Sequence, residues 1–409
     1  EKFGNKVPHP AIIFLALCAL VIVGSHILYL FNVGVAYDVV APEPVVQARD
    51  YYEDSAITST YTPADSYDYS FHVEQQSVKI QSLLTTEGIR FLFTSFVLNF
   101  ANFSVVAVTF VAMMGAGVAE EAGMMGALIR KLVKVSPRRL IAFIIIFVGV
   151  LSSVATDAGY LILIPLGAAA FLSMGRHPLA GMAAAYAGVG AAFGVNLLIT
   201  PVDGMLTEIT NEAIHIAAPG VSLNITANYF FAVASSILLA VVATVITERM
   251  IEPRLGKYEG KPGEEGTEEE TPIDEKAEAR GLRWALYFFL AGAALVALIT
   301  LPPGSALRHP ETGAIVGDSP FMDSLIFIIS MLFLVSGIGY GIGAKTFKNS
   351  NDVIKGITKT FAGLSGLVFM LLIISQFIAY FNYSNMPTVV AVKLADLLEQ
   401  ANIGPVLLL

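Results

Sequence analysis

Long apolar segments are the feature of this sequence that most limits what it can fold into. Several runs of roughly 18 or more apolar positions are separated by short polar segments, and such a run is long enough to cross a bilayer as one helix. Only 14% of the residues are charged, whereas soluble globular proteins have about 25%. The sequence therefore predicts an all-α polytopic membrane protein with the lipid bilayer as its surroundings.

Charge, cysteine and histidine content exclude several classes of function. The formal net charge is −9 and no basic stripe is present, so nucleic acid is not expected as a partner. A single cysteine, Cys18, can build neither a disulfide framework nor a zinc cluster. The histidines lack paired metal-ligand spacing, and HExxH and G-x-S-x-G motifs are absent. We therefore expect no enzyme activity, no cofactor and no structural metal.

Polar segments divide the first part of the chain and orient it. Residues 1–31 are predicted to contain the first transmembrane helix, with the N-terminus in the cytoplasm. Residues 32–84 are rich in acids and poor in bases, so the positive-inside rule predicts an acidic periplasmic loop. The strongest orientation signal is a cluster of cations at Arg130, Lys131, Lys134, Arg138 and Arg139. This cluster places its loop in the cytoplasm.

A charged segment is expected to separate two membrane halves, residues 85–247 and residues 284–409. The segment between them, 248–283, contains a run of glutamates flanked by glycine and proline, and such a composition cannot bury a core. We interpret it as a mobile cytoplasmic linker. The chain stops at Leu409 within what the hydropathy predicts to be the start of another spanning helix, so the second half is expected to be truncated.

Three interruptions of the apolar runs are candidate sites, because unwound backbone and the ends of half-helices supply partners for ions and polar ligands. The first, 115–123, contains Glu120 and Glu121, and the second is 151–159. The third, 194–204, combines a proline with several polar residues. An ionisable group at membrane depth costs about 2.5–3.5 kcal/mol on insertion scales, which makes each acidic residue here a functional hypothesis.

Each interruption also has a structural interpretation. Glu120 and Glu121 can lie at an interface with water, where charged residues are normally found. Asp157 can cap the helix that follows it, and Asp203 can cap the helix expected over 204–217, since aspartate is a preferred N-cap residue. Polar and helix-breaking neighbours favour a functional role most strongly at the third interruption.

The third interruption supports the leading hypothesis for a site. Pro201 disfavours a continuous helix through Thr200, and carbonyl groups freed at membrane depth need protein groups, water or an ion as partners. We expect Asp203 to bind the coupling ion, a proton or alternatively Na⁺ held with Asn196, while Asp157 is a second candidate. The complete set of expected substrate- or ion-binding residues is Asp203, Asn196, Thr200, Pro201, Asp157, Ser153 and Gly194.

Small residues dominate the segment that precedes this interruption. Residues 181–195 include ten glycines or alanines, which allow helix backbones to approach closely in lipid. A leucine at Gly188 or Gly190 is therefore expected to force packed helices apart. The glycines of 337–343 lie inside an apolar run and follow no strand, so we do not interpret them as a nucleotide-binding loop.

Short motifs of specific composition occur along the whole chain. They are Gly4–Pro10, Gly117–Gly123, Ser136–Arg139, Gly159–Pro165, Gly175–Gly181, Tyr186–Val189, Asn196–Leu198, Thr247–Pro253, Arg308–Gly313 and Phe381–Asn385. Together they resemble the AbgT family of p-aminobenzoyl-glutamate transporters. In this resemblance the family's aspartate after the asparagine motif falls on Asp203, and Asp157 falls where relatives can carry another acid. The motifs of the family's second hairpin would lie after Leu409.

The resemblance implies a secondary transporter of the bacterial cytoplasmic (inner) membrane, a homodimer with broken transmembrane helices and two re-entrant hairpins. The small-molecule substrate it implies is p-aminobenzoyl-glutamate or a related aromatic carboxylate, together with export of sulfonamide antimetabolites in some members. An ion gradient, of protons or of Na⁺, is expected to drive transport. A membrane channel or a scaffold subunit of a larger complex is the alternative, and only a carrier would exchange labelled substrate by counterflow.

Overall fold

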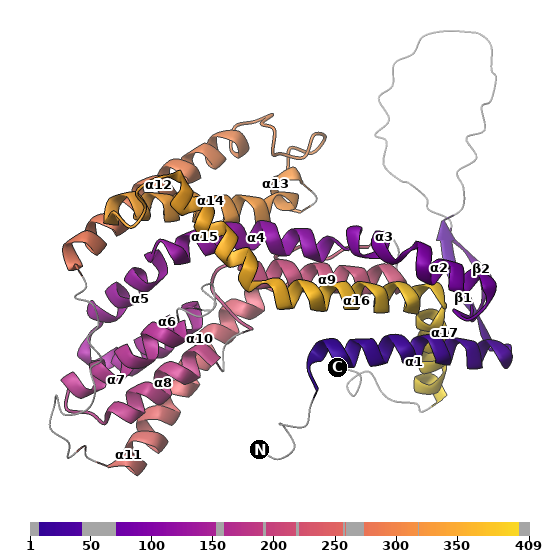
Figure 1. The fold of residues 1–409 in the computed structure, drawn as a ribbon, viewed down its shortest axis with the longest axis horizontal. Coiled ribbons are helices and arrows are strands. Elements are labelled where there is room, and N and C mark those ends of the chain that lie inside the picture. The colour runs from indigo at the N-terminus through magenta and orange to yellow at the C-terminus, as the bar shows by residue number, and fades with distance from the viewer. Residues whose placement is uncertain are drawn as a thin grey trace, which may run out of the picture. The chain divides into compact units, whose positions relative to one another are not determined.

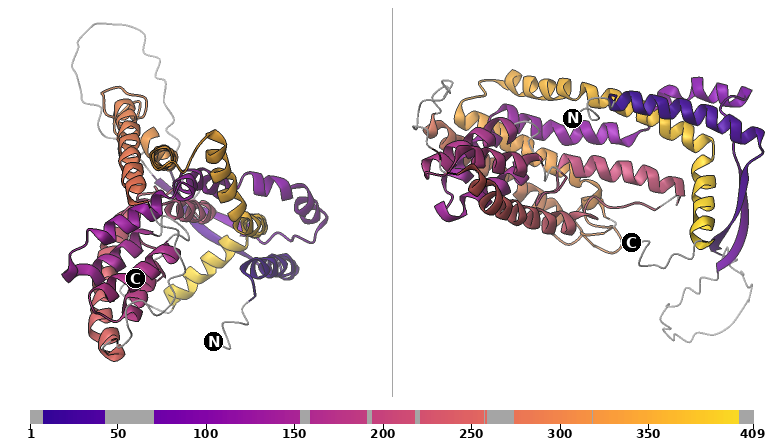
Figure 2. Two further views of the ribbon diagram at one scale, coloured as in Figure 1. Left: turned by 60° about the vertical axis from the view of Figure 1, so that its left-hand side comes forward. Right: turned by 90° about the horizontal axis from the view of Figure 1, so that it is seen from below.

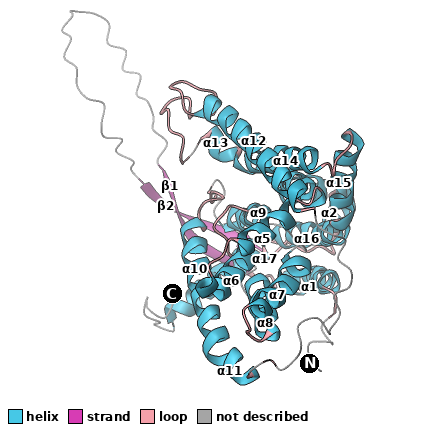
Figure 3. Cartoon of the chain, turned by 90° about the vertical axis from the view of Figure 1, so that its left-hand side faces the viewer, coloured by secondary structure: helices cyan, strands magenta, loops and turns pink. Residues whose placement is uncertain are grey.

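The computed structural model describes residues 8–42, 71–152, 159–190, 194–217, 221–256, 258, 274–317 and 319–400 of the chain. Over these residues the chain is nearly all helical (Figures 1 and 3). It divides into two compact units. The terminal unit comprises residues 1–100 and 372–409, and the central unit comprises residues 101–371.

Six helices in the described part of the chain are long and apolar enough to cross a membrane. They are Pro10–Leu30, Phe96–Glu121, Tyr229–Leu255, Glu275–Thr300, Leu325–Ala344 and Ser365–Tyr383. Large apolar side chains on them point outward, including Leu30, Phe230 and Leu298. Because water would not solvate such surfaces favourably, they fit a chain surrounded by lipid. The expectation of a polytopic helical membrane protein is confirmed.

The terminal unit combines helices with one two-stranded sheet. Its elements are α1 (Pro10–Leu30), β1 (Gly34–Pro42), β2 (Phe71–Lys79), α2 (Thr86–Thr94), α3 (Phe96–Ala101), α16 (Ser365–Tyr383, from residue 372) and α17 (Met386–Gln400). Its apolar core includes Cys18, Val21, Leu83, Ile373 and Tyr380. The cysteine is therefore a packed core residue, as its position in an apolar run indicated.

The segment predicted as an acidic loop, 32–84, contains secondary structure at both of its ends. Strands β1 and β2 pair antiparallel with Gly34 opposite Lys79 and Pro42 opposite Phe71 (Figure 2). Residues 43–70 lie outside the described part. The acid content of 32–84 indicates a loop, whereas the valine and tyrosine residues of Gly34–Pro42 favour a strand.

The central unit contains two groups of packed helices. Its elements are α4 (Ser104–Glu121), α5 (Met124–Lys134), η2 (Arg138–Leu140), α6 (Ile141–Leu151), η4 (Gly159–Leu163), α7 (Ile164–Ser173), α8 (Pro178–Gly190), α9 (Pro201–Ala217), α10 (Tyr229–Ile246), η5 (Thr247–Ile251), α11 (Glu252–Leu255), α12 (Glu275–Thr300), α13 (Pro320–Asp323), α14 (Leu325–Ala344) and α15 (Ser350–Gly363). One group packs α12, α14, α4, α9 and α15, and the other packs α6, α7, α8 and α10 (Figure 1).

Several helices of the second group are too short to span a bilayer alone. Helix α6 has 11 residues, α7 has 10 and α8 has 13, whereas a spanning helix needs about 20. Proline at the start of α7 and of α8 fits their first turns, where an amide hydrogen is not needed. These lengths agree with the prediction of interrupted membrane helices.

The charged segment between the membrane halves is helical at both ends, which corrects the linker expected over 248–283. Helices η5 and α11 continue to Leu255, and helix α12 begins at Glu275. The Asp274 carboxylate accepts hydrogen bonds from the amides of Lys276 and Ala277, and so caps α12. Residues 259–273 lie outside the described part of the chain.

Glycines allow α4, α12 and α14 to pack at very short range. A Cβ atom added to Gly115 would lie 1.8 Å from the Ser330 carbonyl oxygen. The Ser330 hydroxyl joins α14 to α4 directly, because it accepts from the Gly115 amide at 3.1 Å and donates to the Val111 carbonyl at 2.5 Å. Within 337–343, added Cβ atoms would meet Ala119, Phe288, Phe347 and Trp284. These glycines therefore serve helix packing, as their position in an apolar run predicted.

The two glycines singled out in α8 differ in their surroundings. A Cβ atom on Gly188 would lie 2.5 Å from the Ile146 carbonyl oxygen, and one on Gly149 would lie 2.9 Å from Gly188 Cα. At Gly190 the nearest atom is the Tyr160 hydroxyl at 3.3 Å. The expected close approach to backbone therefore applies to Gly188, whereas a small side chain at Gly190 requires only a slight shift of the Tyr160 hydroxyl.

We predict that Gly188→Ala destabilises the protein much more than Gly190→Ala. Overpacking against the backbone of α6 should cost about 1–3 kcal/mol at Gly188, while Gly190→Ala should change stability by about 0.5 kcal/mol or less. Thermal unfolding of both variants in one detergent would measure the difference. Equal unfolding temperatures would contradict the close α6–α8 contact.

Candidate functional site

The third interruption is present in the structure. Helix α8 ends at Gly190, residues 194–200 are not helical, and α9 begins at Pro201. The helix therefore starts earlier than the predicted 204–217, because a proline at the first helical position costs no hydrogen bond. Gly194 is exposed, and an added Cβ atom there would meet nothing within 4 Å.

Asn196 connects this interruption to the end of another helix. Its side chain is only 4% exposed. The amide nitrogen donates to the Val150 carbonyl at 3.3 Å and to the Leu151 carbonyl at 3.5 Å, and the amide oxygen accepts from the Leu198 amide at 3.1 Å. The carbonyls of Val150 and Leu151 belong to the last turn of α6. The third interruption thus lies against the start of the second.

Two of the predicted site residues, Ser153 and Asp157, lie outside the described residues. The contact of Asn196 with Leu151 brings the start of their segment next to the third interruption. Whether Asp157 caps the following helix or binds an ion stays a prediction.

Thr200 and Asp203 form a capping box at the start of α9. The Asp203 Oδ2 atom accepts from the Thr200 amide at 2.6 Å and from the Thr200 hydroxyl at 2.7 Å, and the Asp203 amide donates to that hydroxyl at 3.4 Å. Thr200 is the N-cap residue, and Asp203 is three residues into the motif. Asp203 therefore does help to cap a helix. It does so from the first turn of α9, and Thr200 is the N-cap residue.

The capping box leaves part of the Asp203 carboxylate available. Both hydrogen bonds use Oδ2, and Oδ1 accepts none from the described residues. The side chain is half-buried. A carboxylate held by one oxygen keeps a second oxygen for a proton, an ion or a ligand donor.

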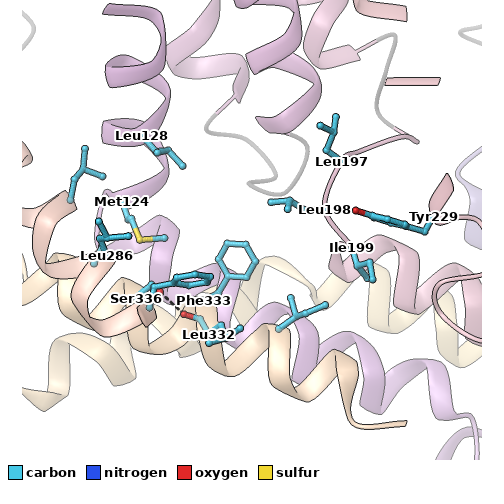
Figure 4. A pocket seen from close by; sticks show the side chains of 14 residues that line it. Met124, Leu128, Leu197, Leu198, Ile199, Tyr229, Leu286, Leu332, Phe333 and Ser336 are labelled. Atoms are coloured by element: carbon cyan, nitrogen blue, oxygen red, sulfur yellow. Dashed lines mark hydrogen bonds between the residues drawn. The ribbon is translucent and has the colours of Figure 1, made fainter. Parts of the chain in front are cut away.

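A cavity of about 550 Å³ lies beside this segment. Leu197, Leu198 and Ile199, the residues between Asn196 and Thr200, form one of its walls (Figure 4). The opposite walls come from α5, α12 and α14, with Tyr229 at the start of α10. Figure 4 shows the Tyr229 hydroxyl directed toward Leu198. The interruption thus forms one side of an open cavity between helices.

The cavity is apolar and partly aromatic. Phe289, Phe333 and Tyr229 contribute rings, and the hydroxyls of Tyr229 and Ser336 are the side-chain polar groups among its lining residues. The Ser336 hydroxyl donates to the Leu332 carbonyl at 2.6 Å, so it is already engaged. Such walls favour an aromatic ring over a charged group. Sequence reasoning did not identify these residues, because nothing in the sequence brings α12 and α14 next to Leu198.

The first interruption is not a break at its acidic residues. Helix α4 continues through Glu121, and the chain turns at Gly123, whose φ of 87° favours glycine. Glu121 accepts a hydrogen bond from Lys359 at 2.6 Å, and Lys359 is 74% exposed. The neighbouring carboxylate raises the pKa of Lys359. The interpretation of Glu121 as an interface residue is favoured over a site within the membrane.

A metal centre receives no support from the described part of the chain. No group of three or more His, Cys, Asp or Glu side chains gathers there in a way that could hold a metal ion. A Na⁺ ion at Asp203 and Asn196 would have to rely on one carboxylate oxygen together with carbonyl and hydroxyl oxygens, which are suitable ligands for a hard cation.

Comparison with known proteins identifies the family. The sequence matches the family described as "AbgT putative transporter family" over residues 1–409. The chain belongs to the AbgT family. It is 30% identical over 404 residues to the p-aminobenzoyl-glutamate transport protein of Escherichia coli (strain K12), covering 99% of this chain and 72% of that protein.

Two solved structures of AbgT-family transporters share the fold. The YdaH transporter of Alcanivorax borkumensis has a TM-score of 0.81 and 33% identity, with 98% of this chain and 76% of that chain covered. MtrF of Neisseria gonorrhoeae, described among a class of antimetabolite efflux pumps, has a TM-score of 0.81 and 33% identity over 99% and 75% of the two chains. These relatives are transporters and pumps, which confirms that the AbgT-family chain is not an enzyme.

The capping box predicts how substitutions at Asp203 affect stability. Asp203→Ala removes the Oδ2 atom that accepts both Thr200 hydrogen bonds and should lower the free energy of unfolding by about 0.5–2 kcal/mol. Asp203→Asn keeps an acceptor oxygen and should stay close to the original protein. Thermal unfolding in detergent measures both, and an Asn variant as unstable as the Ala variant would show that the charge itself holds the turn.

Proposed function

We propose that this AbgT-family chain is a secondary transporter, driven by an ion gradient, that carries p-aminobenzoyl-glutamate or related aromatic carboxylates and exports sulfonamide antimetabolites. The observation that carries the proposal is the position of the apolar cavity. Its wall at Leu197–Ile199 is bounded on one side by Asn196 and on the other by Thr200, whose capping box includes Asp203.

The cavity fits the aromatic part of such a substrate. Its volume, about 550 Å³, lies in the range of about 300–1,000 Å³ typical of small-molecule sites. The rings of Phe289 and Phe333 offer faces and edges for another ring. The polar groups of a substrate are better served at the ends of the broken segment, where Asn196, Thr200 and the free Asp203 oxygen lie.

Asp203 supplies a physical basis for coupling. A substrate with carboxylates and an ionised Asp203 repel each other, and the repulsion is strong where water is partly excluded. Neutralising Asp203 with a proton or Na⁺ removes that repulsion, so ion and substrate occupancy become linked. The same linkage serves import and export, which differ in how the two fluxes are combined.

The proposal also includes a cytoplasmic N-terminus and a homodimeric assembly. The cation cluster at 130–139 supports a cytoplasmic position for that loop, and hence an N-terminus in the cytoplasm. The family resemblance supports a homodimer in the bacterial inner membrane with re-entrant hairpins. Counterflow of labelled substrate in proteoliposomes would separate this carrier from a channel or a scaffold subunit.

We predict that Asp203→Asn abolishes gradient-driven accumulation of labelled p-aminobenzoyl-glutamate in proteoliposomes under an imposed ΔpH or ΔNa⁺. Exchange of substrate without a gradient should continue, because the substitution preserves shape and hydrogen bonding. The matched control is Asp352→Asn. Asp352 occupies the equivalent position of the Asn349 capping box of α15, where its carboxylate accepts from the amides of Lys348 and Asn349.

The control separates coupling from capping. Loss of accumulation in Asp203→Asn alone supports the coupling role. Full accumulation with unchanged pH dependence in Asp203→Asn would refute it, and equal losses in both variants would assign the effect to helix capping.

The aromatic wall makes a separate prediction. Phe333→Ala removes one ring from the cavity and should raise the KM for p-aminobenzoyl-glutamate roughly twofold to tenfold, the effect of about 0.5–1.5 kcal/mol per aromatic pair. Phe230→Ala is the control, since Phe230 is 84% exposed and does not line the cavity. An unchanged KM in Phe333→Ala would place the substrate elsewhere.

A further inference from the structure

A second cavity, of about 710 Å³, opens where the cation cluster meets helix α12. Its walls come from α5, the segment 135–138, α7 and the first turns of α12. Four cationic side chains, Arg130, Lys131, Lys134 and Arg138, line it together with the carboxylates of Glu275 and Glu278. The function proposed above uses none of these residues.

Ion pairs neutralise only half of the cations. Arg130 donates to Glu278 Oε1 through Nε at 3.1 Å and through Nη2 at 2.5 Å, and Lys134 donates to both carboxylate oxygens of Glu275 at 2.8 Å. These pairs join α5 to α12. The side chains of Lys131 and Arg138 form no ion pair or hydrogen bond with any described residue, and both residues are exposed and line the cavity. The lining therefore keeps an excess positive charge.

A buried hydroxyl lies in the same lining. The Ser136 Oγ atom is shielded from solvent and has no hydrogen-bond partner among the described residues. An unpaired buried hydroxyl is unfavourable by about 1–3 kcal/mol.

The remaining wall is apolar. Leu166, Ala170 and Met174 line it from the side of α7, and Leu282 lines it from α12. A free inorganic anion would contact the cations and leave the apolar wall without a partner. A molecule with an anionic head group and a hydrocarbon chain would contact both the cations and the apolar wall.

We propose that this cavity binds an anionic phospholipid. Its phosphate lies at Lys131 and Arg138, and its acyl chain runs along Leu166, Ala170 and Met174. The cations belong to the cluster that the positive-inside rule assigns to the cytoplasmic side, where anionic lipids are attracted to basic groups at helix ends. Basic cavities between membrane helices are suited to such head groups.

The test is native mass spectrometry of the purified full chain titrated with phosphatidylglycerol or with phosphatidylcholine of the same acyl chains. Phosphatidylglycerol should bind more tightly. Arg138→Gln and Lys131→Gln should each weaken its binding about fivefold, because each cation near an anionic lipid contributes about 1 kcal/mol. Arg139→Gln is the matched control, since Arg139 is the adjacent exposed cation and does not line the cavity.

Three results would overturn the proposal. Equal affinity for the two lipids would exclude recognition of the anionic head group. An equal loss in Arg139→Gln would show attraction to the general surface charge. Competition by glycerol phosphate or inorganic phosphate at the same concentration as the lipid would assign the site to a free anion. The comparison of the two lipids on the unaltered chain keeps the test decisive if a charge variant fails to fold.

Discussion

The hydrogen bonds of Asn196 to the last carbonyls of α6 hold the functional region of this protein together. The Asn196 side chain donates to the carbonyls of Val150 and Leu151 in the last turn of α6, and its amide oxygen accepts from the Leu198 amide. This arrangement places Leu197–Ile199 against the cavity and leads the chain into the Thr200–Asp203 capping box. Without it, neither the cavity wall nor the carboxylate would have a defined position.

Close helix packing provides the rigid frame around that segment. Gly115 and Gly337 let α4 and α14 approach until backbone atoms nearly touch, and Ser330 bridges them through two hydrogen bonds. Lipid gives helices little hydrophobic reason to associate, so van der Waals contact and such hydrogen bonds must supply the stabilisation. Larger residues of α12 and α14, such as Phe289 and Phe333, then border a cavity that backbone contact does not fill.

The two cavities described above, both in the central unit, differ in the polarity and charge of their walls. The cavity beside Leu198 is apolar and aromatic, whereas the one beside Arg138 carries excess positive charge, and Leu282 lines both. Salt bridges from Arg130 and Lys134 fix α5 to the first turns of α12. Glu275 and Glu278 lie in the segment whose composition predicts a linker, and their ion pairs give them a structural role in the contact between α5 and α12. Helices α5 and α12 contribute to both cavities, and the cations near the end of α5 give the second one its charge.

The sequence by itself determined the membrane class, the family and the presence of a helix interruption just before α9, because hydropathy and proline act locally. It did not reveal the strands within 32–84, whose pairing joins segments far apart, and it misplaced the start of α9, where Thr200 and Asp203 bond each other. It treated Gly188 and Gly190 alike, although only Gly188 faces the Ile146 backbone. Only the tertiary structure decided that Asn196 bonds α6 and that Leu198 shares a cavity with α12 and α14, because these contacts depend on distances between helices that no local pattern encodes.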